Sequence, residues 1–225
     1  MIRKIDDMYV NGGVCTLVAG AVDPGFKNDA IDCGLYVQLA ASKQFDRFTH
    51  FHDWQAALIK ALTAFGWLRL DFTSQLQPLS APSVVADLMG TALANALDGV
   101  RVEQMDQEFA TQLTRQCAEA ADALVENSVQ LSRSDGVSSV VLQLALLLPS
   151  RQMVLLGLAF ETLETIESNP FAQRLDKQSL IGDLKSFVFV GTLDDLRYAQ
   201  YRQRISEALE HRRSRLCVPF KGAFT

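Results

Sequence analysis

Apolar residues run almost without interruption along one stretch in the second half of the chain. The stretch divides into two arms, residues 140–148 and residues 153–160, and the polar residues 149–152 separate them. A strand with one buried face alternates apolar and polar residues, whereas a strand that is covered on both faces does not. The pattern therefore predicts a β-hairpin at the centre of the fold, with both faces buried and its turn at residues 149–152.

Two stretches in the first third of the chain have the features of helices. The first is expected to begin near Asn28 or Asp29, because either side chain can cap the free backbone N–H groups of a first turn. The second has apolar residues at i, i+4, i+8 and i+11, which form one face of a 3.6-residue period, and Gly66 is well placed to end it. Those apolar residues are Trp54, Leu58, Leu62 and Phe65.

Short strands are expected on either side of this helix pair. Residues 14–22 are mostly apolar, include several β-branched residues and have turn residues on both sides, as a strand has. Residues 67–73 alternate between polar and apolar, which predicts a strand with one buried face. That buried face is expected to carry Leu68, Leu70 and Phe72.

The rest of the chain is expected to add helices first and strands afterwards. Apolar residues at helical spacing predict helices over residues 84–97 and 103–126. Strands are expected at residues 129–131 and 186–190, followed by a last helix over residues 194–215.

The order of these elements favours an α+β fold. We expect a single domain, residues 1–225, in which an antiparallel or mixed β-sheet contains the strongly apolar central hairpin and is covered by helices on both faces. Six apolar side chains of the hairpin and the later strand are expected to be almost fully buried: Leu144, Leu146, Leu155, Phe160, Phe187 and Phe189.

The composition indicates a core that needs no crosslinks. With 225 residues, of which 48% are hydrophobic, the chain can bury a sizeable core by itself. The four cysteines are far apart and form no C-x-x-C pair, so reduced thiols are expected.

No stretch reaches the roughly 18 apolar residues of a membrane-spanning helix, and the N-terminal residues lack the apolar core of a secretory signal. We therefore expect a soluble protein made in the cytoplasm, and release from the cell stays open.

The motif His50-Phe51-His52-Asp53 is the strongest candidate for catalytic chemistry. In an extended segment His50 and His52 point the same way, so with Asp53 they could ligate a metal ion or supply a base. The alternative is that they simply begin a helix, where the charge of Asp53 favours the N-terminus. The alternative is favoured, because the third histidine is about 160 residues away and no cysteine pair is nearby. No cofactor and no metal are therefore expected.

Charge is distributed unevenly along the chain. Residues 195–221 contain seven basic and three acidic residues, a net charge of +4, which leaves −9 for the remainder. Arg212, Arg213 and Arg215 are the candidates for a partner site, which could bind an acidic lipid surface or the acidic helix 103–126 of a second copy. Leu216, Val218 and Phe220 could supply the apolar part of such a contact or pack onto their own chain. The overall charge of −5 argues against a specific nucleic-acid partner.

Three classes of function are compatible with these observations. A non-enzymatic protein that acts by binding or self-assembly, as a homo-oligomer, is favoured because no set of His, Cys and carboxylate residues converges. Helix pairs before a strongly apolar antiparallel sheet are similar in outline to Cyt-type cytolysins, and that resemblance implies a membrane-active toxin. The alternatives are a metal-dependent or His/Asp hydrolase that uses His50, His52 and Asp53, and a small-ligand carrier with its pocket between helices and sheet.

Overall fold

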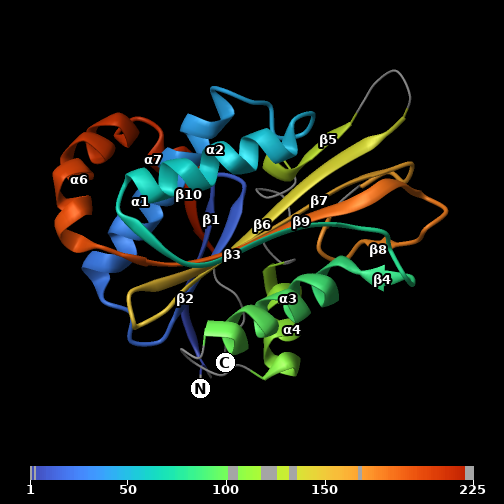
Figure 1. The fold of residues 1–225 in the computed structure, drawn as a ribbon, viewed down its shortest axis with the longest axis horizontal. Helices are drawn as coiled ribbons and strands as arrows, with labels where there is room; N and C mark the ends of the chain where they lie inside the picture. Colours follow the sequence, from blue (N-terminus) through green and yellow to red (C-terminus); the bar gives the residue numbers. More distant parts are fainter. Residues whose placement is uncertain are drawn as a thin grey trace.

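A mixed β-sheet runs through the molecule, and helices cover both of its faces (Figure 1). The structure is a computed structural model that describes residues 2, 4–100, 106–117, 126–131, 136–166 and 169–220. Within these residues the main sheet has eight strands in the order β10-β1-β2-β6-β7-β9-β3, with β5 paired to β6. The strands are β1 (Ile5–Asn11), β2 (Val14–Ala19), β3 (Trp67–Gln77), β5 (Val129–Leu131), β6 (Ser138–Leu147), β7 (Gln152–Thr162), β9 (Leu180–Leu193) and β10 (Cys217–Phe220). A second, two-stranded sheet pairs β4 (Ser83–Val84) with β8 (Arg174–Leu175).

The helices form two layers, one on each side of the sheet. The first layer contains α1 (Pro24–Ser42), α2 (Phe51–Ala64), α6 (Asp195–Leu209) and α7 (Arg213–Leu216), and the second contains α3 (Val85–Val100) and α4 (Gln107–Gln116) (Figure 1). Each layer packs on its own cluster of buried apolar residues. The expected α+β fold with helices on both faces is confirmed. No helix within the described ranges combines the length and apolar character that crossing a membrane requires.

The central hairpin is confirmed as β6 and β7, which pair along their full length. Side chains of β6 alternate between the two layers: Leu144 packs in the α3–α4 core, whereas Ala145 packs in the α1–α2 core. Because both cores are apolar, both faces of the hairpin are apolar, and this explains the nearly continuous run in the sequence. All six residues expected in the core are at most 5% exposed.

The sheet is mixed because β2 and β6 pair in parallel, whereas the other pairs of the main sheet are antiparallel. The chain passes through α1, α2, β3, α3 and α4 between these two neighbours. Strand β1, which the sequence pattern did not predict, forms a hairpin with β2. Its turn contains Gly12 at φ +64°, a conformation that glycine adopts without steric cost.

The expected start of the first helix, near Asn28 or Asp29, is wrong. The helix α1 begins at Pro24, and the Asp23 carboxylate caps it by accepting a hydrogen bond from the Phe26 N–H at 2.8 Å. Proline favours the first position of a helix because its φ is already helical and it lacks the N–H that would stay unpaired. Asn28 and Asp29 therefore lie inside the first turns rather than before them.

The expected buried face of residues 67–73 is also wrong. Leu68 is 39% and Leu70 49% exposed, whereas Phe72 is half-buried. Strand β3 lies at the end of the described sheet and pairs only with β9. A bulge between Arg69 and Asp71 interrupts the ladder, so the alternation of faces shifts by one residue there.

The last helix is shorter than expected. Helix α6 ends at Leu209, α7 is a separate short helix, and β10 then pairs with β1. Leu216 packs against the α1–α2 core and Phe220 against the α3–α4 core, while Val218 is exposed. Two of the three residues, Leu216 and Phe220, therefore pack onto their own chain. Of the expected helix 103–126, the structure shows α4; residues 103–105 and 118–125 lie outside the described residues.

Candidate functional site

The three residues predicted as a long-shot catalytic or metal site lie on the surface at the start of α2. His50 precedes the helix, and its Nδ1 atom is 2.8 Å from the Thr49 hydroxyl oxygen. His52 and Asp53 are exposed in the first turn. Across the described part of the chain, no group of three His, Cys, Asp or Glu side chains is arranged to hold a metal ion. The enzyme hypothesis therefore gains no support from this site.

The three arginines predicted as a partner site have different environments. The Nη1 atom of Arg213 is 3.1 Å from the Oδ2 atom of Asp32 in α1, so this arginine has a partner within its own chain. Arg212 and Arg215 are exposed, and neither forms an ion pair with another residue that the structure describes. Contact with an acidic lipid or a second copy stays a prediction for Arg212 and Arg215.

Polar contacts fasten α6 and α7 to α1. The guanidinium of Arg202 donates two hydrogen bonds to the buried Asp29 carboxylate, at 2.8 Å to Oδ1 and 2.7 Å to Oδ2. This two-pronged geometry is the strongest form of arginine–carboxylate contact. With the Arg213–Asp32 pair it holds two consecutive helices of the first layer against a third.

Asp32 makes the stability of this layer depend on pH. Burial raises the pKa of Asp32 above its ordinary value of 3.8, an effect that Arg213 opposes and Asp29 reinforces. Folding therefore favours the protonated form, and the native protein binds this proton more tightly than the unfolded chain. As pH rises through the folded-state pKa, Asp32 becomes charged and its contribution to stability falls.

The side chain of Asp32→Asn stays neutral at every pH. We therefore expect the unfolding free energy of this variant, relative to that of the wild type, to be higher at neutral pH than in acid. As pH is lowered toward 3.8, the difference in unfolding free energy should shift in favour of the wild type. Urea unfolding at several pH values between 3.5 and 7 measures this difference, at roughly constant slope against denaturant. A constant difference, or a shift of the opposite sign, would contradict the assignment.

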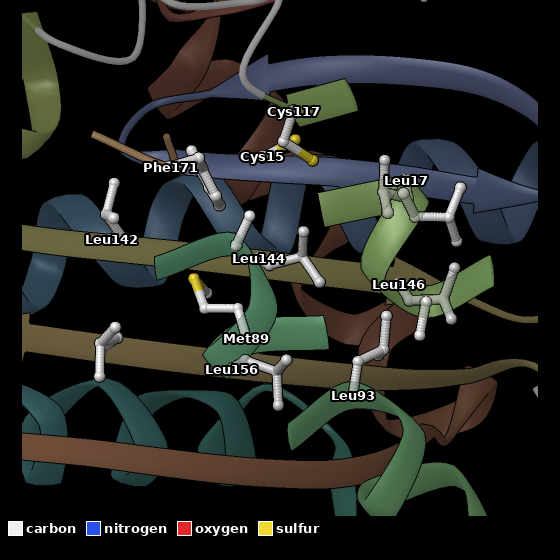
Figure 2. Close-up of a cluster of buried hydrophobic side chains, with 14 of the residues drawn as sticks. Cys15, Leu17, Met89, Leu93, Cys117, Leu142, Leu144, Leu146, Leu156 and Phe171 are labelled. Carbon is white, nitrogen blue, oxygen red and sulfur yellow. The ribbon is translucent and has the colours of Figure 1, made fainter. Parts of the chain in front are cut away.

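The second layer, α3 and α4, contacts the sheet through apolar side chains. Figure 2 shows Met89 and Leu93 of α3 in the same apolar cluster as Leu144, Leu146 and Leu156 of the sheet. Met89 and Leu93 are at most 2% exposed. The sheet side of this interface is therefore a continuous apolar surface.

Hydrogen bonds within the second layer run between its own two helices. The Thr114 hydroxyl donates to the Ala86 carbonyl at 2.7 Å, and Arg115 pairs with Asp87 at 2.8 Å. Its hydrogen bonds to the rest of the described chain are at the start of α3, where the N–H groups of Val85 and Ala86 donate to the 171–173 loop at 3.0 and 2.9 Å. Between the described residues of α3–α4 and the main sheet, the contacts are apolar.

The first layer is attached in a different way, through polar groups as well as apolar ones. Gln38 of α1 donates to the Asn11 carbonyl of β1 at 3.0 Å and accepts from the Gly13 N–H at 3.1 Å. Asn11 in turn donates to the Ile31 carbonyl at 2.9 Å. These directional bonds, together with the ion pairs of α6 and α7, fix the first layer in place. Among the residues that the structure describes, the α3–α4 layer is therefore the one joined to the main sheet by the fewest hydrogen bonds.

A groove of about 470 Å³ lies beside α3, where the second layer stops short of the last strands. Strand β3 supplies a polar wall, and α3, β7 and β9 supply apolar side chains. Representative lining residues are Asp71, Thr73, Gln75, Leu88, Leu158 and Val188. Part of the apolar sheet face under the second layer is thus already accessible from one side.

Comparison with known proteins finds similarity in structure only. No protein-family model matches the chain, and no curated protein matches it in sequence. A delta-endotoxin is 14% identical and has a TM-score of 0.46, with 86% of each chain covered. The activated Cyt2Ba monomer of Bacillus thuringiensis subsp. israelensis is 14% identical with a TM-score of 0.43, covering 80% of this chain and 97% of its own. The Evf virulence factor is 12% identical with a TM-score of 0.40, covering 89% and 83%.

Proposed function

We propose that this protein is non-enzymatic and acts by binding lipid membranes, through the apolar sheet face that α3 and α4 cover. The observation that carries the proposal is the contrast between the two layers. The hydrogen bonds of the described part of the α3–α4 pair run between its own helices or to the 171–173 loop, and the pair contacts the main sheet through apolar side chains. Hydrogen bonds join the first layer to the sheet.

Apolar packing is non-directional, and its free energy scales with the area removed from water. Acyl chains can therefore replace α3 and α4 as the cover of the sheet without leaving a hydrogen-bond partner unpaired there. In water the same separation would expose the apolar face of several strands, so the layer stays closed. Strands β6 and β7 suit this exchange because their apolar residues are buried on both faces.

The acidic lipid surface predicted from the arginines is a separate proposal. Arg212 and Arg215 belong to the segment around α7, which lies on the α1–α2 side of the sheet (Figure 1). A membrane in contact with them would not be covering the α3–α4 face. The proposed mechanism therefore requires apolar contact, and anionic lipid is not essential to it.

Release of a trapped dye from phosphatidylcholine vesicles tests the proposal. We expect release that increases with protein concentration and that Leu93→Ala accelerates at least several-fold. Leu93 of α3 is fully buried against the sheet, and its truncation weakens that layer by about 2–5 kcal/mol. The rate of release from wild-type and variant protein is compared at the same lipid concentration.

Leu58→Ala is the matched control, because Leu58 is equally buried but belongs to α2 in the first layer. It should lower overall stability by a similar amount and leave the release rate nearly unchanged. No release at any protein concentration would reject membrane action. Equal acceleration by both variants would show that general unfolding, rather than movement of α3–α4, exposes the sheet.

A small-ligand carrier is the second candidate function, and the groove beside α3 favours it. Its apolar floor and polar wall suit a molecule with a long apolar chain and an uncharged polar group. The vesicle experiment separates the two functions. A carrier would remove lipid from the vesicles in a fixed ratio to protein while the dye stays inside.

A further inference from the structure

Two cysteines that are about 100 residues apart in the sequence meet between the second layer and the sheet. Cys15 is in β2, Cys117 directly follows α4, and both are 0% exposed. Figure 2 shows their sulfur atoms next to each other, at one end of the apolar interface. The remaining cysteines are elsewhere: Cys33 is in α1 and Cys217 is in β10.

The environment of the pair keeps Cys117 in the thiol form while the layer is closed. Burial raises the pKa of the Cys117 thiol, and its contact with the Cys15 thiol raises it further. A thiol without thiolate character and without access to solvent reacts slowly with oxidants. The pair is therefore protected in the closed protein and becomes reactive when α4 moves away from β2 or before the chain has folded.

We propose that Cys15 and Cys117 are a redox modification site, at which a disulfide bond fastens α4 to β2 and so locks the second layer onto the sheet. The disulfide itself follows from the placement of the two thiols. Its effect on membrane binding rests on the proposed function, because α3–α4 is the layer that must separate there.

The oxidant is a small disulfide such as oxidised glutathione. One cysteine loses its proton, and its sulfur bonds to one sulfur of the small disulfide, whose S–S bond breaks and releases a thiolate. The second cysteine then loses its proton and attacks the protein sulfur of this mixed disulfide, which releases the other thiolate. The two thiolates take up the two protons, so the cysteines are oxidised and the small disulfide is reduced to two thiols.

The first experiment tests the disulfide without reference to membranes. The protein is refolded in oxidised glutathione, and free thiols are counted after denaturation, with mass spectrometry of peptides. We expect the four thiols to fall to two, with a peptide pair linked through Cys15 and Cys117. Cys33→Ala, which removes another buried thiol, should still form the link, and Cys15→Ala should not. Four thiols in the oxidised wild type, or a link between other cysteines, would overturn the proposal.

The second experiment compares oxidised and reduced wild-type protein in the vesicle assay, so that no substitution can disturb folding. We expect the oxidised form to release dye about tenfold more slowly or not at all, since the crosslink opposes opening of the structure it joins. Dithiothreitol, added before the vesicles, should restore the rate. Equal release by a form that is shown to be linked would overturn the locking role.

The failures of the two proposals are distinguishable. If the link forms but neither redox form releases dye, the modification site is supported and the membrane function is rejected. If dye is released and no link forms, the membrane function is supported and the modification site is rejected.

Discussion

Leu144→Ala and Phe187→Ala are each expected to lower the free energy of unfolding by about 2–5 kcal/mol. Leu144 is 0% exposed in the α3–α4 core, and Phe187 is 2% exposed in the α1–α2 core. Each truncation removes apolar contacts and leaves a cavity that the packed sheet cannot close. The two variants together test both faces of the sheet, because each substitution lies on a different face.

Denaturant unfolding measures both variants, and Leu196→Ala is the control. Leu196 is an α6 leucine with 84% of its surface exposed, so its truncation should change stability by no more than about 0.5 kcal/mol. Near-wild-type stability in either core variant would show that the corresponding face of the sheet is not packed as described. An equally large loss in Leu196→Ala would point to a change in the helix rather than to a cavity.

Gly157→Ala is expected to lower the free energy of unfolding by about 1–3 kcal/mol, somewhat less than the two core truncations. Gly157 of β7 lies directly opposite Phe187 of β9, and a Cβ atom there would overlap the Phe187 ring. The ring cannot move aside easily, because it is buried and its centroid is 6.1 Å from that of Phe51. The absence of a side chain at Gly157 is therefore what admits the aromatic ring.

Two further variants make this explanation testable by the same unfolding measurement. In Gly157→Ala with Phe187→Ala the overlap is gone, so the combined loss should be smaller than the sum of the single losses. Gly99→Ala is the control: an added Cβ at this α3 position contacts nothing within 4 Å, and alanine is the better helix former. That variant should be as stable as the wild type or slightly more stable. Additive losses in the double variant would contradict the steric explanation.

Local patterns predicted the elements whose environment is uniform along their length. Residues 140–148 and 153–160 were recognisable as the central strands because both faces meet apolar cores. Helix α2 was recognisable because one side of it faces the core throughout. The start of α1 carried a usable signal that was missed, since Asp23 followed by Pro24 is a typical cap and first helical residue.

The candidate site could be predicted only in part. The arginines were identified from charge, but the sequence does not indicate that Arg213 pairs with Asp32 whereas Arg212 and Arg215 stay exposed. The histidine motif was identified from residue type, and the structure brings no further ligand to it within the described residues. The contrast between the two helical layers has no local signal, because it depends on which polar groups meet across the sheet.

By itself, the sequence determined the α+β class, the apolar central hairpin and the presence of helices on both of its faces. These features depend on the period of apolar residues within about ten positions, and the backbone geometry of strands and helices sets that period. Only the tertiary structure decided that β2 and β6 pair in parallel, that β3 is the exposed last strand of the described sheet, and that Cys15 lies next to Cys117. Each of these features depends on a contact between residues far apart in the sequence. The local sequence around each residue does not indicate which distant residue it contacts.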